Sequence, residues 1–217
     1  MHKVQHISLI AFRAIPLTDT IEYRVNNRKV DLSSLQNSSA DLDEINISTD
    51  EMFEKLKNHF SALSACAYLS GTTAPKTFKY LIILHVGSKA KIYGFMGAKT
   101  VELVQVFYHL FKGRYCAFLR NPKAGKKVFL LSLFDGGVRR AFSNFLRASL
   151  RNPLRIFDRI YVQTIHLQQP SEIFEGKQNL CDGCANMMVY KGKLINSCGL
   201  DEYRMFGAPI IPVQCTK

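Results

Sequence analysis

The sequence predicts an α+β fold that is mostly helical, with a small Cys-bearing β-hairpin near the C-terminus. Apolar residues recur at helical spacing in several segments, and Gly and Pro residues mark where these segments end. Near the C-terminus, a Lys-Gly-Lys turn separates the two short predicted strands of a hairpin. The 217 residues, of which 47% are hydrophobic, suffice to bury a core in one or two domains. This composition excludes a disordered chain and a collagen-like one.

Capping signals and apolar periodicity predict the helices. Ser48 followed by Glu51 is a capping box, and apolar residues then recur at helical spacing. Gly113 stops a second amphipathic segment, and Asn152 with Pro153 begins a further one. The predicted helices cover residues 50–63, 74–87, 100–111, 138–150, 152–161 and 201–206.

The segment over residues 74–87 is also compatible with a strand. Pro75 suits the first turn of a helix and Gly87 suits its end, which favours a helix. The β-branched Ile82 and Ile83 would suit a buried strand equally well. We expect a helix here.

Turn chemistry predicts the non-helical parts. A strand is expected over residues 162–167, followed by a hairpin over 187–196 that turns at Lys191–Lys193. Residues 25–48 are rich in Asn, Ser and Asp, which satisfy their own backbone in turns, so a long surface loop is expected there.

Charge separates the beginning of the chain from the rest. The net charge is +12, and because residues 1–57 are slightly acidic, the positive excess lies in residues 58–217. We predict three consecutive parts: an N-terminal strand and loop segment over residues 1–47, a helical basic domain over 48–167, and a cysteine-knuckle hairpin with a tail over 168–217.

Three of the six cysteines lie close together near the C-terminus, at Cys181, Cys184 and Cys198. Two residues between Cys181 and Cys184 let both sulfurs face one soft metal centre, and Gly183 permits the left-handed backbone that such a turn often needs. If the chain folds back at Gly192, Cys198 returns beside this turn. The spacing therefore predicts a metal site on these three thiols, with incidental cysteines or a redox pair as the alternatives.

The identity of the metal depends on the fourth ligand. A structural zinc site usually takes two pairs of ligands, and the sequence has no second Cys-x-x-Cys and no His-x-x-x-His. We therefore favour a [4Fe-4S] cluster over zinc, since its fourth ligand can be remote or absent. Cys215 is the best candidate for that ligand, with His166 and Cys116 behind it.

From Ile47 onward, the order of motifs resembles the region C-terminal to the barrel in certain radical SAM proteins. This resemblance implies an auxiliary iron–sulfur cluster on Cys181, Cys184 and Cys198, near the active site of an enzyme that cleaves S-adenosylmethionine to a radical. The motifs that carry it are Ile47–Met52, Ala67–Thr72, Ile92–Gly97, Glu102–Val106, Phe111–Tyr115, Asn179–Cys184 and Ser197–Tyr203.

One hallmark of that family is missing from the sequence. The Cys-x-x-x-Cys-x-x-Cys triplet that holds the radical-generating cluster does not occur in this chain. We therefore expect an accessory domain or a split C-terminal part of a radical SAM-type enzyme that is not catalytic alone. Its partner would be a barrel-bearing domain or subunit, and S-adenosylmethionine would bind only through that partner. The sequence identifies no catalytic residue.

A strongly basic segment offers a different hypothesis. Residues 111–160 hold twelve Lys and Arg against two Asp, and four of the arginines recur every fourth residue from Arg147 to Arg159. Such a segment suits an anionic ligand, nucleic acid or an anionic membrane surface, or is only a solvated basic face. Nucleic acid is less favoured as a ligand, because aromatic residues do not alternate with the Lys and Arg residues of this segment. The rival function is a basic zinc-knuckle adaptor that binds nucleic acid or membrane.

The remaining signals are weaker. No apolar run is long enough to cross a membrane and no signal-peptide core is present, so we expect a cytoplasmic protein, with a peripheral place on the inner membrane face as an option. The glycine-containing stretch over residues 94–100 could cradle a phosphate before a helix, although a plain connection is preferred. His59, His85 and His109 are expected to be packed or surface residues, and no hydrolase motif is found.

Overall fold

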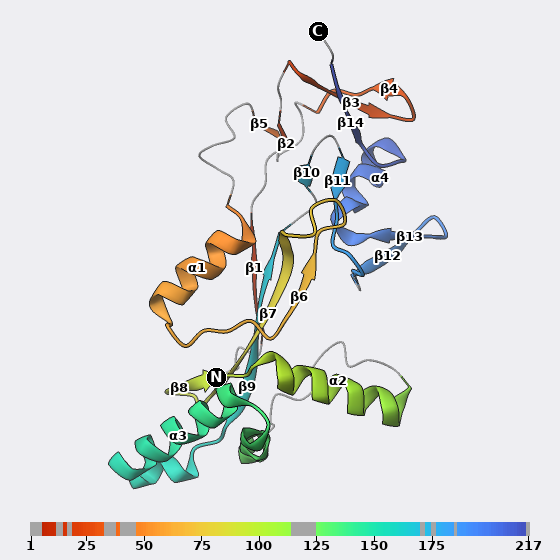
Figure 1. Cartoon of the computed structure of the whole chain (residues 1–217). Helices are drawn as coiled ribbons and strands as arrows, with labels where there is room; N and C mark the ends of the chain where they lie inside the picture. Colours follow the sequence, from red (N-terminus) through yellow and green to blue (C-terminus); the bar gives the residue numbers. More distant parts are fainter. Residues whose placement is uncertain are drawn as a thin grey trace. The chain divides into compact units, whose positions relative to one another are not determined.

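The computed structural model describes most of the chain and leaves out residues 1–5, 12–14, 17–18, 33–37, 40–46, 114–124, 170–171, 175–176, 185 and 216–217. The protein is α+β, and the expectation that it is mostly helical is wrong, because strands take up nearly as much of the described chain as helices (Figure 1). The helices are α1 (Thr49–His59), α2 (Ala98–Lys112), η1 (Gly125–Leu133), α3 (Gly136–Arg151), η2 (Pro153–Phe157), η3 (Ser197–Gly199) and α4 (Leu200–Phe206).

A five-stranded sheet holds the longest strands, in the order β1-β9-β7-β6, with β8 also paired to β7. Its members are β1 (His6–Ile10), β6 (Ala67–Ser70), β7 (Phe78–Gly87), β8 (Ile92–Phe95) and β9 (Tyr161–Gln168). Smaller sheets pair β14 (Ile211–Gln214), β3 (Ile21–Val25) and β4 (Arg28–Lys29); β10 (Glu172–Phe174) and β11 (Lys177–Asn179); β12 (Met187–Tyr190) and β13 (Lys193–Asn196); and β2 (Ile15–Pro16) and β5 (Ser38–Ser39).

The largest correction concerns residues 74–87, where a helix was expected. Residues 78–87 form strand β7, and its residues Lys79, Leu81 and Ile83 are buried while the residues between them are less so. This alternation is the two-residue period of a strand. The β-branched side chains prevail over the helix signals because β7 has strand partners on both sides, which local sequence does not reveal.

The other helix predictions are confirmed in type, with changed ends. The capping box is formed, since Ser48 N donates to Glu51 Oε2 at 2.6 Å and Glu51 N to Ser48 Oγ at 3.1 Å, but α1 ends at His59. The helix expected over 152–161 is only the short η2, because strand β9 takes over at Tyr161. The expected strand over 162–167 and hairpin over 187–196 are present.

The chain divides into two compact units that are interleaved along the sequence. The first unit comprises Met1–Leu9, Phe53–Tyr68 and Leu81–Leu167, and the second comprises Ile10–Met52, Leu69–Tyr80 and Gln168–Lys217. The division into 1–47, 48–167 and 168–217 stays a prediction.

The first unit buries the inner face of α3 against β8 and η1. Val138, Ala141 and Phe145 of α3 are at most 4% exposed, and the Phe145 ring lies edge-on to Tyr93 at 5.3 Å. Gly94 is required for this packing, because a Cβ there would lie 2.9 Å from the Ala141 Cβ. The result is an aromatic core under one amphipathic helix.

The second unit contains the small sheets and the cysteine segment. Its β-sheet core is built around Tyr23, Val25 and Leu32, and a turn at Asn26 and Asn27, both with positive φ, joins β3 to β4. The long loop expected over 25–48 therefore begins as a hairpin, and most of its remainder lies outside the described residues.

Among the described residues, no helix has the length and apolarity that crossing a bilayer requires.

Candidate functional site

The segment before Cys181 is fixed by a buried amide. Asn179 is fully buried in the second unit, and its Oδ1 accepts hydrogen bonds from Thr73 N at 3.0 Å and Ala74 N at 3.2 Å. Gly71 makes this approach possible, because a Cβ there would lie 2.2 Å from Asn179 Oδ1. The loop after β6 and the chain before Cys181 are thereby held together.

The cysteine turn itself continues this pairing. Cys181 forms an isolated antiparallel bridge with Gly71, and Asp182 N donates to Ser70 O at 2.8 Å. Gly183 has φ +64°, the left-handed conformation expected for it, and the chain then reaches the half-buried Cys184. The turn therefore rests on the end of β6 and does not hang free.

The β12–β13 hairpin returns the chain to this turn. Lys191 and Gly192 have φ of +48° and +76°, the geometry of a tight two-residue turn. At the base of the hairpin, Ser197 N donates to Asn186 O at 3.0 Å, and Asn186 N donates to Cys184 Sγ at 3.4 Å. Cys198 follows Ser197 directly, so the third thiol stands at the same base.

Electrostatic coupling identifies the three thiols as neighbours. The pKa of Cys181 is raised to about 12, first by burial and then by the nearby Cys184 and Cys198, while the charge of Lys79 acts to lower it. The side chains of Cys181 and Cys184 also share a hydrogen bond. The pKa of Tyr80 is raised to about 12, first by burial and then by Cys184 and Cys181.

Polar donors surround the sulfurs. Gln168 Nε2 donates to Cys198 Sγ at 3.6 Å, and the backbone N of Asn186 donates to Cys184 Sγ. The positive charge of the fully buried Lys79 acts to lower the pKa of Cys181. Donors and positive charge near sulfur are what thiolate ligands of a metal or cluster need around them. The hydrogen-bond donors and the positive charge around the sulfurs are therefore compatible with thiolate ligands.

The thiols do not form a complete ligand set as they lie. Cys181, Cys184 and Cys198 are free cysteines, and within the described ranges no three His, Cys, Asp or Glu side chains form a group that could hold a metal ion. Cys181 and Cys184 are in contact, whereas Cys198 is an electrostatic neighbour only. Binding of a metal would require the third thiol to close on the other two.

The other expected ligands are placed elsewhere or not described. Cys215 is exposed just after β14, where its N donates to Thr20 O at 2.9 Å. His166 is buried in β9, and within the described ranges it forms no metal-binding group with the thiols. Cys116 lies outside the described residues. The structure thus offers no fourth ligand among the described cysteines at the hairpin base.

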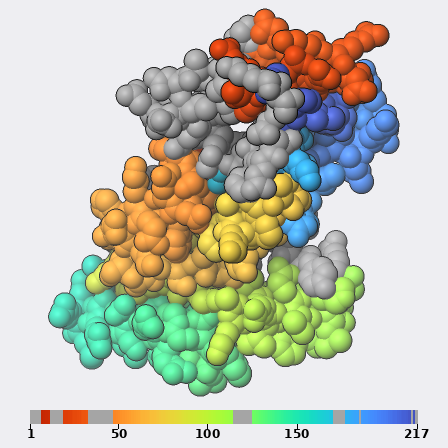
Figure 2. Space-filling view, turned by 45° about the horizontal axis from the view of Figure 1, so that its top comes forward, coloured from red at the N-terminus to blue at the C-terminus, as the bar shows by residue number. Residues whose placement is uncertain are grey.

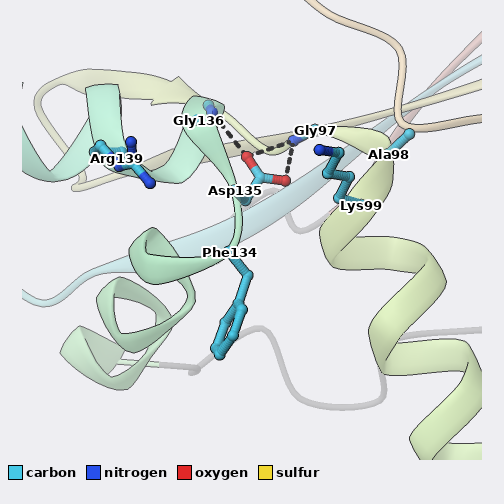
Figure 3. Close-up of a pocket in the computed structure, with 8 residues that line it drawn as sticks. Gly97, Ala98, Lys99, Phe134, Asp135, Gly136 and Arg139 are labelled. Atoms are coloured by element: carbon cyan, nitrogen blue, oxygen red, sulfur yellow. Dashed lines mark hydrogen bonds between the residues drawn. The ribbon is translucent and has the colours of Figure 1, made fainter.

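A feature that the sequence reasoning missed lies in the first unit, at the stretch considered as a phosphate cradle. The Asp135 carboxylate, 2% exposed, caps α3 through Gly137 N at 2.7 Å and also accepts from Gly97 N at 2.9 Å and Thr100 Oγ1 at 2.7 Å, at the start of α2. Figure 3 shows this carboxylate beside Gly97. Two backbone amides of this stretch, Gly97 N and Thr100 N, are therefore already bonded to Asp135. The Asp-Gly-Gly sequence before α3 signals the first of these caps, but nothing local signals the second.

Comparison with known proteins gives no match to a family model, to a curated protein or to a solved structure. The resemblance to radical SAM accessory regions therefore rests on the sequence motifs alone.

Proposed function

We propose that Cys181, Cys184 and Cys198 are ligands of a [4Fe-4S] cluster in an accessory domain, or split C-terminal part, of a radical SAM-type enzyme. The observation that carries the proposal is that the free thiols of Cys181 and Cys184 share a hydrogen bond, while Cys198 and the buried Lys79 both act electrostatically on Cys181. The cluster would supply electron transfer, substrate positioning or structural support when bound.

The charge of the site supports a metal centre over a redox pair. A catalytic Cys-x-x-Cys pair needs a thiolate at neutral pH, which is usually obtained by lowering the pKa of one thiol. The pKa of Cys181 is instead raised to about 12 by burial, so without a metal this thiol stays protonated and inert. A metal overcomes this cost because it binds the thiolate directly and displaces the proton.

Lys79 has a defined part in this proposal. A cluster held by thiolates is anionic, and an anion in a buried position needs a counter-charge. Lys79 is fully buried and lowers the pKa of Cys181, so its ammonium would partly neutralise the ligand set. This counter-charge favours an anionic centre over an apolar packing role for the three thiols.

The missing Cys-x-x-x-Cys-x-x-Cys triplet limits what the chain would do alone. In this proposal a barrel-bearing partner supplies the radical-generating cluster and binds S-adenosylmethionine. This chain contributes the auxiliary site and is not itself the catalyst.

The test is anaerobic reconstitution of the full chain with iron and sulfide, followed by elemental analysis. We expect about four iron and four sulfide per chain and broad visible absorption, as a [4Fe-4S] cluster requires. Serine variants of the three site cysteines should lose the cluster, whereas Cys66→Ala should keep it, because Cys66 lies in the core of the first unit and donates to Ile82 O. Zinc without iron or sulfide would contradict the cluster and leave the zinc-knuckle alternative.

A further inference from the structure

Three basic side chains line one pocket on the surface of the first unit. Lys91, Arg147 and Arg151 surround a pocket of about 340 Å³, and its other lining residues, Ile92, Asn144 and Ala148, are uncharged. Arg147 and Arg151 lie one helical turn apart on α3. In the described part of the chain, none of the three bases has an acidic partner, so the pocket is an unneutralised positive site.

Large apolar side chains are exposed at the end of α3 and in the η2 that follows it. Leu150 near the end of α3 is 84% exposed, and Leu154 and Phe157 of the following η2 are 75% and 80% exposed. Leu150 lies three residues after Arg147, so the two are neighbours on the helix surface. The teal atoms of this region lie at the surface of the molecule in Figure 2. We call the six residues Lys91, Arg147, Arg151, Leu150, Leu154 and Phe157 the basic–apolar face.

No exposed acid offsets the positive charge along this part of the chain. Over residues 125–160 the only acids are Asp135, which is buried and hydrogen-bonded, and Asp158, which is paired with Arg155 at 4.0 Å. The bases in the same range are Lys126, Lys127, Arg139, Arg140, Arg147, Arg151, Arg155 and Arg159. The potential of this surface therefore favours an anionic partner.

We infer that the basic–apolar face binds the surface of an anionic phospholipid bilayer. Lys91, Arg147 and Arg151 would hold a lipid phosphate, and Leu150, Leu154 and Phe157 would enter the boundary between headgroups and acyl chains. A combination of Lys and Arg with exposed Leu and Phe side chains is typical of proteins that bind at the membrane interface. Nucleic acid would satisfy the charge but leave the three apolar side chains in water.

The first test is cosedimentation of the full chain with two kinds of vesicle, phosphatidylcholine alone and phosphatidylcholine with phosphatidylserine. We expect binding to the anionic vesicles only, weakening as salt rises. The double variant Arg147→Glu and Arg151→Glu should bind about thirtyfold or more weakly. A matched control, Arg28→Glu with Lys177→Glu, changes the net charge equally at exposed sites of the second unit and should bind as the native chain does.

The outcomes separate the membrane from other anions. The inference is overturned if the anionic vesicles do not bind, if both double variants weaken equally, or if inorganic phosphate alone displaces the protein from vesicles at low concentration. Capture by an acidic polypeptide with no vesicle binding would likewise contradict it and assign the face to a protein partner.

The second test measures insertion directly. The chain contains no Trp, so Phe157→Trp introduces a single reporter on the basic–apolar face. Its fluorescence should shift to the blue on adding anionic vesicles, because the indole leaves water. Val189→Trp, at a site 73% exposed in the second unit, is the control and should not shift. Equal responses of the two variants, or none from Phe157→Trp, would contradict insertion.

Discussion

The backbone amide of Asn186 donates a hydrogen bond to Cys184 Sγ at 3.4 Å, and this contact joins the cysteine turn to the β12–β13 hairpin. The carbonyl of Asn186 in turn accepts from Ser197 N, the residue before Cys198. One residue therefore links the second thiol to the segment that carries the third. Backbone hydrogen bonds therefore hold the cysteine turn and the start of η3 together.

The first prediction concerns the counter-charge. Replacing Lys79 with Met removes the ammonium but keeps a long side chain in the fully buried position. The pKa of Cys181 should rise further, and the iron and sulfide taken up on reconstitution should fall several-fold, while the circular dichroism spectrum stays unchanged. Full cluster occupancy in Lys79→Met would show that the counter-charge is not needed.

The second prediction concerns thiol reactivity in the metal-free protein. Burial raises the pKa of Cys181 to about 12 and that of Cys66 to about 11, so at pH 8 less than roughly one in a thousand of either is thiolate. Iodoacetamide followed by mass spectrometry should label the exposed Cys215 first and these two last. Rapid labelling of Cys181 in the folded chain would contradict its burial.

The third prediction concerns the amide that fixes the cysteine turn. Asn179→Ala leaves Thr73 N and Ala74 N without their acceptor in a buried place, which should cost about 2–3 kcal/mol of unfolding free energy. Urea unfolding of the full chain measures it. Asn58→Ala, at an exposed site on α1, is the matched control and should change stability little. Equal losses of stability in the two variants would contradict a stabilising role for the hydrogen bonds of Asn179.

The fourth prediction is the pH dependence that Asp135 gives to the first unit. Burial acts to raise the pKa of Asp135, but the hydrogen bonds from Thr100, Val138 and Gly137 outweigh it, so the pKa lies below its ordinary value. A lowered folded pKa adds stability that is present above the unfolded pKa of about 3.9 and is lost as pH falls through the folded value. Asp135→Asn should therefore be less stable at pH 7 and lose less stability than the native chain on acidification below about pH 4. Parallel pH profiles of the two proteins would rule this out.

The parts that sequence could predict are those set by short-range chemistry. The capping box at Ser48, the left-handed Gly183 and the turn at Gly192 depend on residues within a few positions, and all three are found. The sequence favours a helix where strand β7 lies, because pairing with distant strands decides the structure of this segment. The mostly helical expectation failed for the same reason.

The surroundings of the candidate site were also beyond the sequence. Lys79 precedes Cys181 by about a hundred residues, and only the register of β7 places it in a buried position that acts on that thiol. The Asp135 cap of α2 likewise joins segments far apart in the chain, through Gly97 and Thr100. Such contacts follow from tertiary packing, for which a single sequence carries no local signal.

The most direct test of the central claim is the iron and sulfide content of the anaerobically reconstituted full chain, measured beside the triple variant of Cys181, Cys184 and Cys198 to Ser. We expect the native chain to bind iron and sulfide in equal amounts and the variant to bind neither. Equal metal content in both proteins, or zinc without sulfide in the native one, would contradict it.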